Sequence, residues 1–134
     1  MNLTKITLLA VSSLLFLGCS SAPKDTVTEM YDALSKGDLK KLNEYATEPT
    51  IMRFSMGAAM QCQTDTNEYS DTNEFMSACM KDFFSHMRIE DIQVVSETDT
   101  TATVIVIENI EGKNFKEHMQ LVKVDGKWKV NIGQ

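Results

Sequence analysis

The spacing of apolar residues changes along the chain and divides it into a helical part and a strand-forming part. The first helical segment follows Asp25, a suitable N-cap, and ends near Gly37, which suits a left-handed residue at a helix C-terminus. Its apolar residues share the i, i+3, i+4, i+7 spacing of one helix face: Val27, Met30, Tyr31 and Leu34. A short second helix is predicted after Asp38, and Pro49 is expected to stop it.

Two further helices are predicted in the middle of the chain, over residues 50–62 and 74–86. In the first, the methionines at positions 52, 56 and 60 form a stripe of their own, which is typical of an adaptable helix–helix core. The polar residues 63–73 between the two helices predict a loop.

From Arg88 onward the apolar period is two, which predicts strands over residues 89–97, 101–109 and 116–124. Asp125-Gly126 then predicts a two-residue type I′ turn, which would pair Leu121 with Val130 and Met119 with Ile132. Helices followed by an antiparallel meander indicate an α+β fold, with N-terminal helices packed on a curved antiparallel sheet of about four strands.

The N-terminus carries the features of an export signal. Residues 1–18 hold one charge and an apolar run too short to span a bilayer, followed by Gly18-Cys19. Phe16-Leu17-Gly18-Cys19 resembles a bacterial lipoprotein signal, which implies cleavage after Gly18, a lipid on Cys19 and attachment to the membrane. Ser20 implies the periplasmic face of the outer membrane if the host is Gram-negative. We therefore expect a signal peptide over 1–18, a tether over 19–24 and one domain over 25–134.

Charge narrows the range of partners. The chain has a net charge of −6 and a pI near 4.8, which argues against a nucleic-acid partner. Of the 13 basic residues Lys5 is lost with residues 1–18, so 12 basic residues face 19 acidic ones and the net charge becomes −7. Electrostatic steering would favour a basic partner.

Two segments resemble a known family. Val-x-x-Met-Tyr-Asp-Ala-Leu and Lys-Gly-Asp-Leu-Lys-Lys-Leu in residues 25–46, with the closing Val-Asp-Gly-Lys-Trp-Lys-Val within residues 88–132, resemble the NTF2-like, cystatin-type superfamily and its DUF4878-like lipoproteins. The resemblance implies a cone between helices and sheet, either open to a ligand or filled by side chains. The candidate lining residues are Tyr31, Met76, Met80, Phe83, Met119, Leu121 and Trp128.

Cys62 and Cys79 remain after lipidation of Cys19, and they form either a structural disulfide or a redox or metal pair. Sixteen residues separate them, which matches no C-x-x-C motif, so the sequence favours the disulfide. Copper is the metal that the methionines and His86 would suit, but no Met-x-x-Met or His-x-x-Met cluster is present. No metal site and no cofactor is predicted.

No catalytic set stands out in the sequence. His86 and His118 are the histidines of the chain, and no serine has a nucleophile motif. Three carboxylates with apolar neighbours, Asp82, Glu108 and Glu117, are candidates for a pocket, although solvated surface is expected for each.

The sequence favours a non-catalytic binding module over an enzyme. Its ligand would be a small apolar or peptide-like molecule held in the cone. The alternative is a protein-interaction lipoprotein, such as an inhibitor or immunity-type protein, that binds a basic partner through its acidic surface. The sequence leaves the oligomeric state open.

Overall fold

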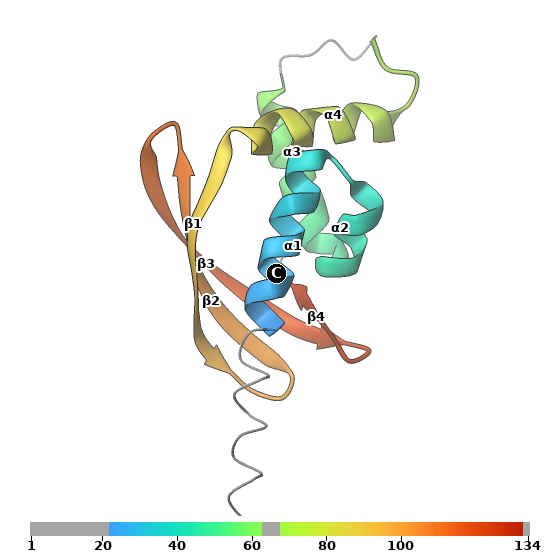
Figure 1. Cartoon of the computed structure of the whole chain (residues 1–134). Helices are drawn as coiled ribbons and strands as arrows, with labels where there is room; N and C mark the ends of the chain where they lie inside the picture. Colours follow the sequence, from blue (N-terminus) through green and yellow to red (C-terminus); the bar gives the residue numbers. More distant parts are fainter. Residues whose placement is uncertain (1–21, 63–67, 133–134) are drawn as a thin grey trace, which may run out of the picture.

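The computed structural model describes residues 22–62 and 68–132, and within them four helices precede a four-stranded antiparallel sheet (Figure 1). This confirms the α+β class. The elements are α1 Ala22–Lys36, α2 Leu39–Tyr45, α3 Glu48–Gln61, α4 Thr72–Ser85, β1 Met87–Glu97, β2 Thr101–Ile110, β3 Lys113–Val124 and β4 Lys127–Val130. Cys19 lies outside the described residues. None of the four described helices has the length and hydropathy that a membrane-spanning helix needs.

Helix ends follow from local chemistry, with two corrections to the predicted boundaries. Gly37 has a φ of 64° after α1, and the Asp38 side chain accepts a hydrogen bond from the Lys41 amide at the start of α2, both as predicted. Asp25 lies in the first turn of α1 rather than at its N-cap, because the helix already includes Ala22. Pro49 does not end α2 but occupies the first turn of α3, where its missing N–H costs nothing.

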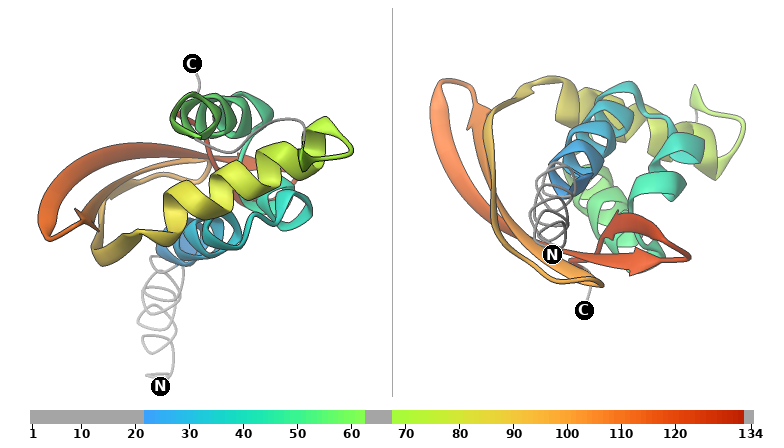
Figure 2. Two further views of the ribbon diagram at one scale, coloured as in Figure 1. Left: turned by 90° about the horizontal axis from the view of Figure 1, so that it is seen from above. Right: turned by 60° about the horizontal axis from the view of Figure 1, so that its bottom comes forward.

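The sheet has the order β1-β2-β3-β4 and curls around the helices, so that α1 lies in its concave side (Figure 2). The central strand β2 turns Ala102, Val104 and Val106 inward, where all three are buried against the helical layer. The other face of β2 carries Thr103, Ile105 and Ile107, which are half-buried, so helices cover this central strand on one side.

Two tight turns set the register of the sheet. Asp125 and Gly126 have φ values of 51° and 78°, and Leu121 pairs with Val130, as the type I′ turn predicted. The predicted pairing of Met119 with Ile132 is wrong, because the chain leaves the sheet and the Ile132 amide donates to Thr50 Oγ1 at 2.9 Å. A second positive-φ turn at positions 111–112 starts β3 at position 113, three residues earlier than predicted.

The middle of the expected cone is a packed core. Met80, Met119 and Leu121 are fully buried, and they belong to one cluster with residues of α1 and β4. The methionine stripe of α3 was expected in this core, and that expectation is wrong. Because Phe54 and Ala58 turn to the core from the other face of α3, Met52, Met56 and Met60 remain 57%, 58% and 85% exposed.

Candidate functional site

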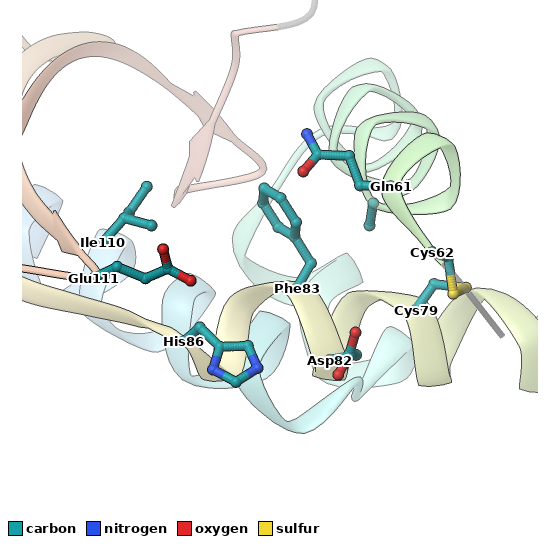
Figure 3. A pocket seen from close by; sticks show the side chains of 9 residues that line it. Gln61, Cys62, Cys79, Asp82, Phe83, His86, Ile110 and Glu111 are labelled. Atoms are coloured by element: carbon teal, nitrogen blue, oxygen red, sulfur yellow. A yellow bond between two sulfur atoms is a disulfide. The ribbon is translucent and has the colours of Figure 1, made fainter.

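A hollow of about 350 Å³ lies between the ends of α3 and α4 and the turn that joins β2 to β3 (Figure 3). Its lining is Ala58, Gln61, Cys62, Cys79, Asp82, Phe83, His86, Ile110 and Glu111. The volume suits a small molecule or one side chain of a larger ligand.

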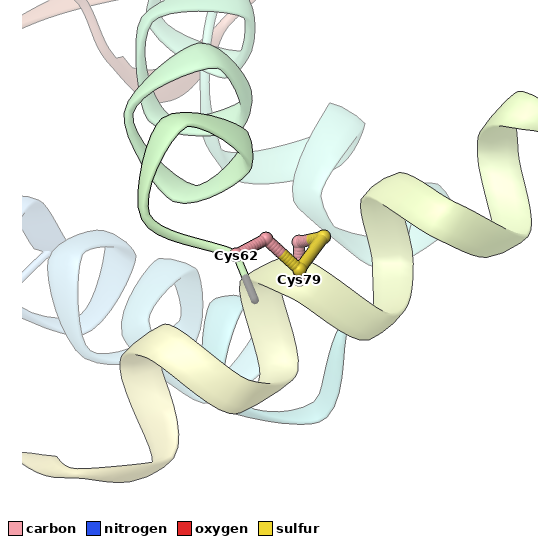
Figure 4. Close-up of a disulfide and its surroundings, with 2 residues drawn as sticks. All are labelled: Cys62 and Cys79. Atoms are coloured by element: carbon pink, nitrogen blue, oxygen red, sulfur yellow. A yellow bond between two sulfur atoms is a disulfide. The ribbon is translucent and has the colours of Figure 1, made fainter. Parts of the chain in front are cut away.

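A disulfide fixes the helical wall of this hollow. Cys62, at the C-terminal end of α3, is bonded to Cys79 in the middle of α4, with 5.4 Å between their Cα atoms (Figure 4). This is the pair that the sequence favoured as a structural disulfide. The link holds the two helices at one point, and Phe83, one turn further along α4, projects its ring into the hollow.

Contacts with neighbouring aromatic rings hold the Phe83 side chain in place. The ring centroids of Phe83 and Phe84 are 4.9 Å apart in an edge-to-face arrangement, and Phe84 meets Phe54 of α3 in the same way at 5.6 Å. Phe84 is buried, so it anchors this row of rings to the core. Phe83 therefore presents a fixed apolar surface to whatever enters the hollow.

The opposite wall comes from the sheet. Ile110 ends β2, and Glu111 follows it with a φ of 52° in the two-residue turn to β3. In Figure 3 the Glu111 carboxylate extends into the same space as the His86 ring. The lining thus combines apolar surface with the carboxylates of Asp82 and Glu111, and none of its nine residues is a lysine or arginine.

A buried polar pair lies close to this wall. Glu108, two residues before Ile110 on the same face of β2, accepts a hydrogen bond from the Oη of Tyr31 on α1. Burial raises the pKa of the Glu108 carboxyl above its ordinary value; the Tyr31 hydrogen bond opposes this rise, and the charge of nearby Glu117 adds to it. The pKa of Tyr31 is also raised, by burial first and then by the charge of Glu108.

The structure separates the residues proposed from sequence. Among the candidate cone residues, Phe83 lines the hollow, and Met76 is partly buried on α4. Tyr31, Met80, Met119, Leu121 and Trp128 belong to the core, where Tyr31 also bonds Glu108.

The candidate carboxylates and histidines are also divided. Asp82 and Glu117 are exposed as expected, but Glu108 is buried, because its position on β2 faces α1. His86 lines the hollow, whereas His118 is exposed on β3. In the described residues no three His, Cys, Asp or Glu side chains are placed to hold a metal ion.

Sequence reasoning missed Ile110 and Glu111. Glu111-Gly112 was a usable signal, because a polar residue before glycine between two alternating segments is typical of a two-residue hairpin turn. That signal would have placed Glu111 at the tip of a hairpin. It would not have shown that the tip faces α4.

Comparison with known proteins identifies the family. Residues 17–131 match the family model DUF4878, a domain of unknown function, so the chain belongs to the DUF4878 family. No curated protein matches the sequence.

Two crystal structures are similar at low identity. One is a Campylobacter jejuni protein provisionally assigned as an NTF2-like transpeptidase; it is 17% identical, with 81% of this chain and 95% of that chain covered and a TM-score of 0.44. The other is a Shewanella frigidimarina protein provisionally assigned as a ketosteroid isomerase; it is 19% identical, with 84% and 93% covered and a TM-score of 0.47.

Proposed function

We propose that this DUF4878 chain is a non-catalytic binding module, attached by a lipid on Cys19 to the periplasmic face of the outer membrane, and that its ligand occupies the hollow of Figure 3. The observation that carries the proposal is the lining of that hollow. An aromatic ring and an aliphatic side chain lie beside two carboxylates and the His86 imidazole, with no lysine or arginine among the lining residues. Such a lining favours an amphipathic ligand over an anion.

The ligand we propose is a small or peptide-like molecule with an apolar body and a positively charged amino group. Its apolar part would pack on Phe83 and Ile110, while Asp82 and Glu111 would accept hydrogen bonds from the cation. Hydrogen bonds between charged partners are roughly twice as strong as neutral ones. The hollow would therefore discriminate by charge more sharply than by the shape of the apolar part.

Alkylamines test this chemistry directly. We expect octylamine to bind more tightly than octanoate, which has the same chain length and the opposite charge, when each is titrated calorimetrically into the full chain. Asp82→Asn with Glu111→Gln should weaken octylamine at least tenfold, whereas Glu44→Gln, at an exposed site on α2, should change nothing. Equal affinity for the two probes, or an unaffected double variant, would refute the site.

A basic protein is the second candidate partner, favoured by the net charge of −7 after removal of residues 1–18. The same two carboxylates would then receive a lysine or arginine side chain of that protein. Binding of a lysozyme, used as the basic probe, should weaken steeply between 50 and 200 mM salt, because exposed charges are screened. If it binds while octylamine does not, the protein-interaction function replaces the small-ligand function.

The lipid anchor is tested independently of the ligand. Cys19→Ala should release the chain from the membrane fraction or leave it unprocessed, and it should remove labelling by a fatty-acid probe, since the acyl chains supply the membrane affinity. Unchanged fractionation together with no label on the unsubstituted chain would rule out lipidation.

A further inference from the structure

About half of strand β3 pairs with a neighbouring strand on one side only, so that its other side forms an open edge of the sheet. β4 pairs with β3 only from Leu121 to Val124, and the Asn131 amide then donates to the Gln120 carbonyl at 2.7 Å. After this bond the chain turns away toward α3. Within residues 22–62 and 68–132, the stretch from position 113 to 119 therefore has β2 on one side and no strand on the other.

This edge differs from the other free edge of the sheet. β1 is interrupted by two register shifts, between Ile89 and Asp91 and between Val94 and Ser96, and such irregularities blunt an edge against pairing. The β2–β3 ladder runs without a shift, and residues 113–118 are all exposed. Phe115, in the middle of the stretch, is 49% exposed. The open edge of β3 is thus a regular template for another strand.

The turn fixes which backbone groups face outward. Ile110 and Lys113 flank a two-residue turn, so position 113 and the odd-numbered positions after it bond to β2. The amides and carbonyls of Asn114 and Lys116 point to the open side. The bond from Asn131 to the carbonyl of Gln120, another even-numbered residue, follows the same alternation.

We propose that a second copy of this chain pairs with this edge, with the two β3 strands antiparallel about a two-fold axis at Phe115. Asn114 of each copy then exchanges two backbone hydrogen bonds with Lys116 of the other, which uses the outward groups. On one face of the joined sheet Phe115 meets its symmetry mate, and Lys113 of each copy lies opposite Glu117 of the other. An isologous contact of this kind closes on itself as a dimer.

Charge selects this register over its neighbours. Moving the axis to position 116 would place Lys116 opposite its own copy, and moving it to position 117 would do the same for Glu117; like charges directly opposite are unfavourable. With the axis at Phe115, neither Lys116 nor Glu117 lies opposite its own copy, and two Lys113–Glu117 pairs form instead. At the end of this stretch, where the turn of the second copy would lie, there is a hollow of about 280 Å³ lined by Arg53, Glu117, His118, Gln120, Asn131 and Ile132.

Disulfide trapping tests the pairing in the full chain. Residues directly opposite across an antiparallel pair have Cα atoms about 4.5–5.5 Å apart, within the range of a disulfide. Phe115→Cys, expressed in cells and mildly oxidised, should give a covalent dimer on a non-reducing gel. Val95→Cys, 56% exposed on the opposite edge, is the matched control and should remain monomeric. No dimer with Phe115→Cys, or equal dimer in both, overturns the proposal.

Charge reversal tests the register. Added to Phe115→Cys, Lys113→Glu or Glu117→Lys alone should reduce the dimer at least fivefold, because each puts like charges opposite each other. The two reversals together should restore it. If the single reversals leave the yield of covalent dimer unchanged, this register is overturned.

A zero-length cross-link tests the unsubstituted protein and does not depend on how a variant folds. A carbodiimide should join Lys113 to Glu117, and mass spectrometry of the peptides should identify the bond. Four residues along one strand span about 13 Å, so this link reports two copies. Its absence from the cross-linked full chain overturns the proposal.

Discussion

Of the four glycines that the structure describes, Gly37 is the one at which an added methyl group should cost the most stability. Its φ is 64°, and an ideal Cβ built on it would lie 2.4 Å from the backbone oxygen of Ser77 and 2.7 Å from the Ser77 hydroxyl. That hydroxyl also donates a hydrogen bond to the Gly37 carbonyl. The turn between α1 and α2 therefore packs directly on the backbone of α4, and Gly37→Ala must push the two apart.

Three costs make up the expected effect of Gly37→Ala. A non-glycine residue in the left-handed region costs about 1–2 kcal/mol. Overpacking against a backbone that cannot rotate away costs about 1–3 kcal/mol, and loss of the Ser77 hydrogen bond adds about 1 kcal/mol. We expect a total loss of about 4 kcal/mol in the free energy of unfolding, a large share of the stability of a domain of this size.

Two other glycines separate these costs. Gly112 has a φ of 86° with open space around its Cβ position, so Gly112→Ala should show the backbone cost alone, about 1–2 kcal/mol. Gly57 lies in α3 with open space, so Gly57→Ala should stabilise by up to about 1 kcal/mol. Urea unfolding of the three variants measures the differences. If Gly37→Ala and Gly112→Ala lose the same free energy, the close contact with α4 is refuted.

Three further substitutions test the disulfide, the buried carboxyl and the last hairpin. Replacing Cys62 and Cys79 by alanine should lower the free energy of unfolding in urea by about 3 kcal/mol, the chain-entropy value for a loop of this length, and an unchanged midpoint would contradict the link. The pKa of Glu108 is raised in the folded state, so the folded state binds that proton more tightly than the unfolded state, and the free energy of unfolding should fall as pH rises through this pKa. Glu108→Gln removes the titrating group, so the stability of this variant relative to the unsubstituted protein should increase from pH 4 to pH 8. Parallel pH profiles of the two proteins would refute a raised pKa at Glu108. Gly126→Val should lower the melting temperature through a loss of about 1–3 kcal/mol, because a β-branched residue would be forced to positive φ.

Elements governed by neighbouring residues could be predicted from the sequence. The hairpin at Asp125-Gly126 depends on two residues that tolerate positive φ, and the cap at Asp38 depends on a side chain that reaches an amide three residues on. Both are local properties of the chain. The alternation of β2 likewise separated its side chains into two faces, but both faces are apolar, and only the structure shows that Ala102, Val104 and Val106 face the helices.

The features that depend on packing between distant segments could not be predicted. Ile132 leaves the sheet because Thr50 of α3 offers its amide an acceptor, and nothing in the sequence near Ile132 indicates this. Glu108 was expected on the surface, yet Tyr31, 77 positions earlier, bonds it in the interior. The methionine pattern of α3 fits a buried face equally well, and the packing of its opposite face on the core decided which side remained exposed.

The hollow depends both on local features of the chain and on packing between distant segments. Its carboxylates come from Asp82 on a helix and Glu111 in a strand turn, so only the fold brings them together. The disulfide forms part of its wall and also joins it to the core, because Cys79 is buried in the core cluster while Cys62 packs against that cluster. Reduction of the Cys62–Cys79 bond would therefore free the C-terminal end of α3 from α4 and loosen the wall of the hollow. A ligand site of this construction would be kept in shape in an oxidising compartment, the environment that the signal at residues 1–18 predicts.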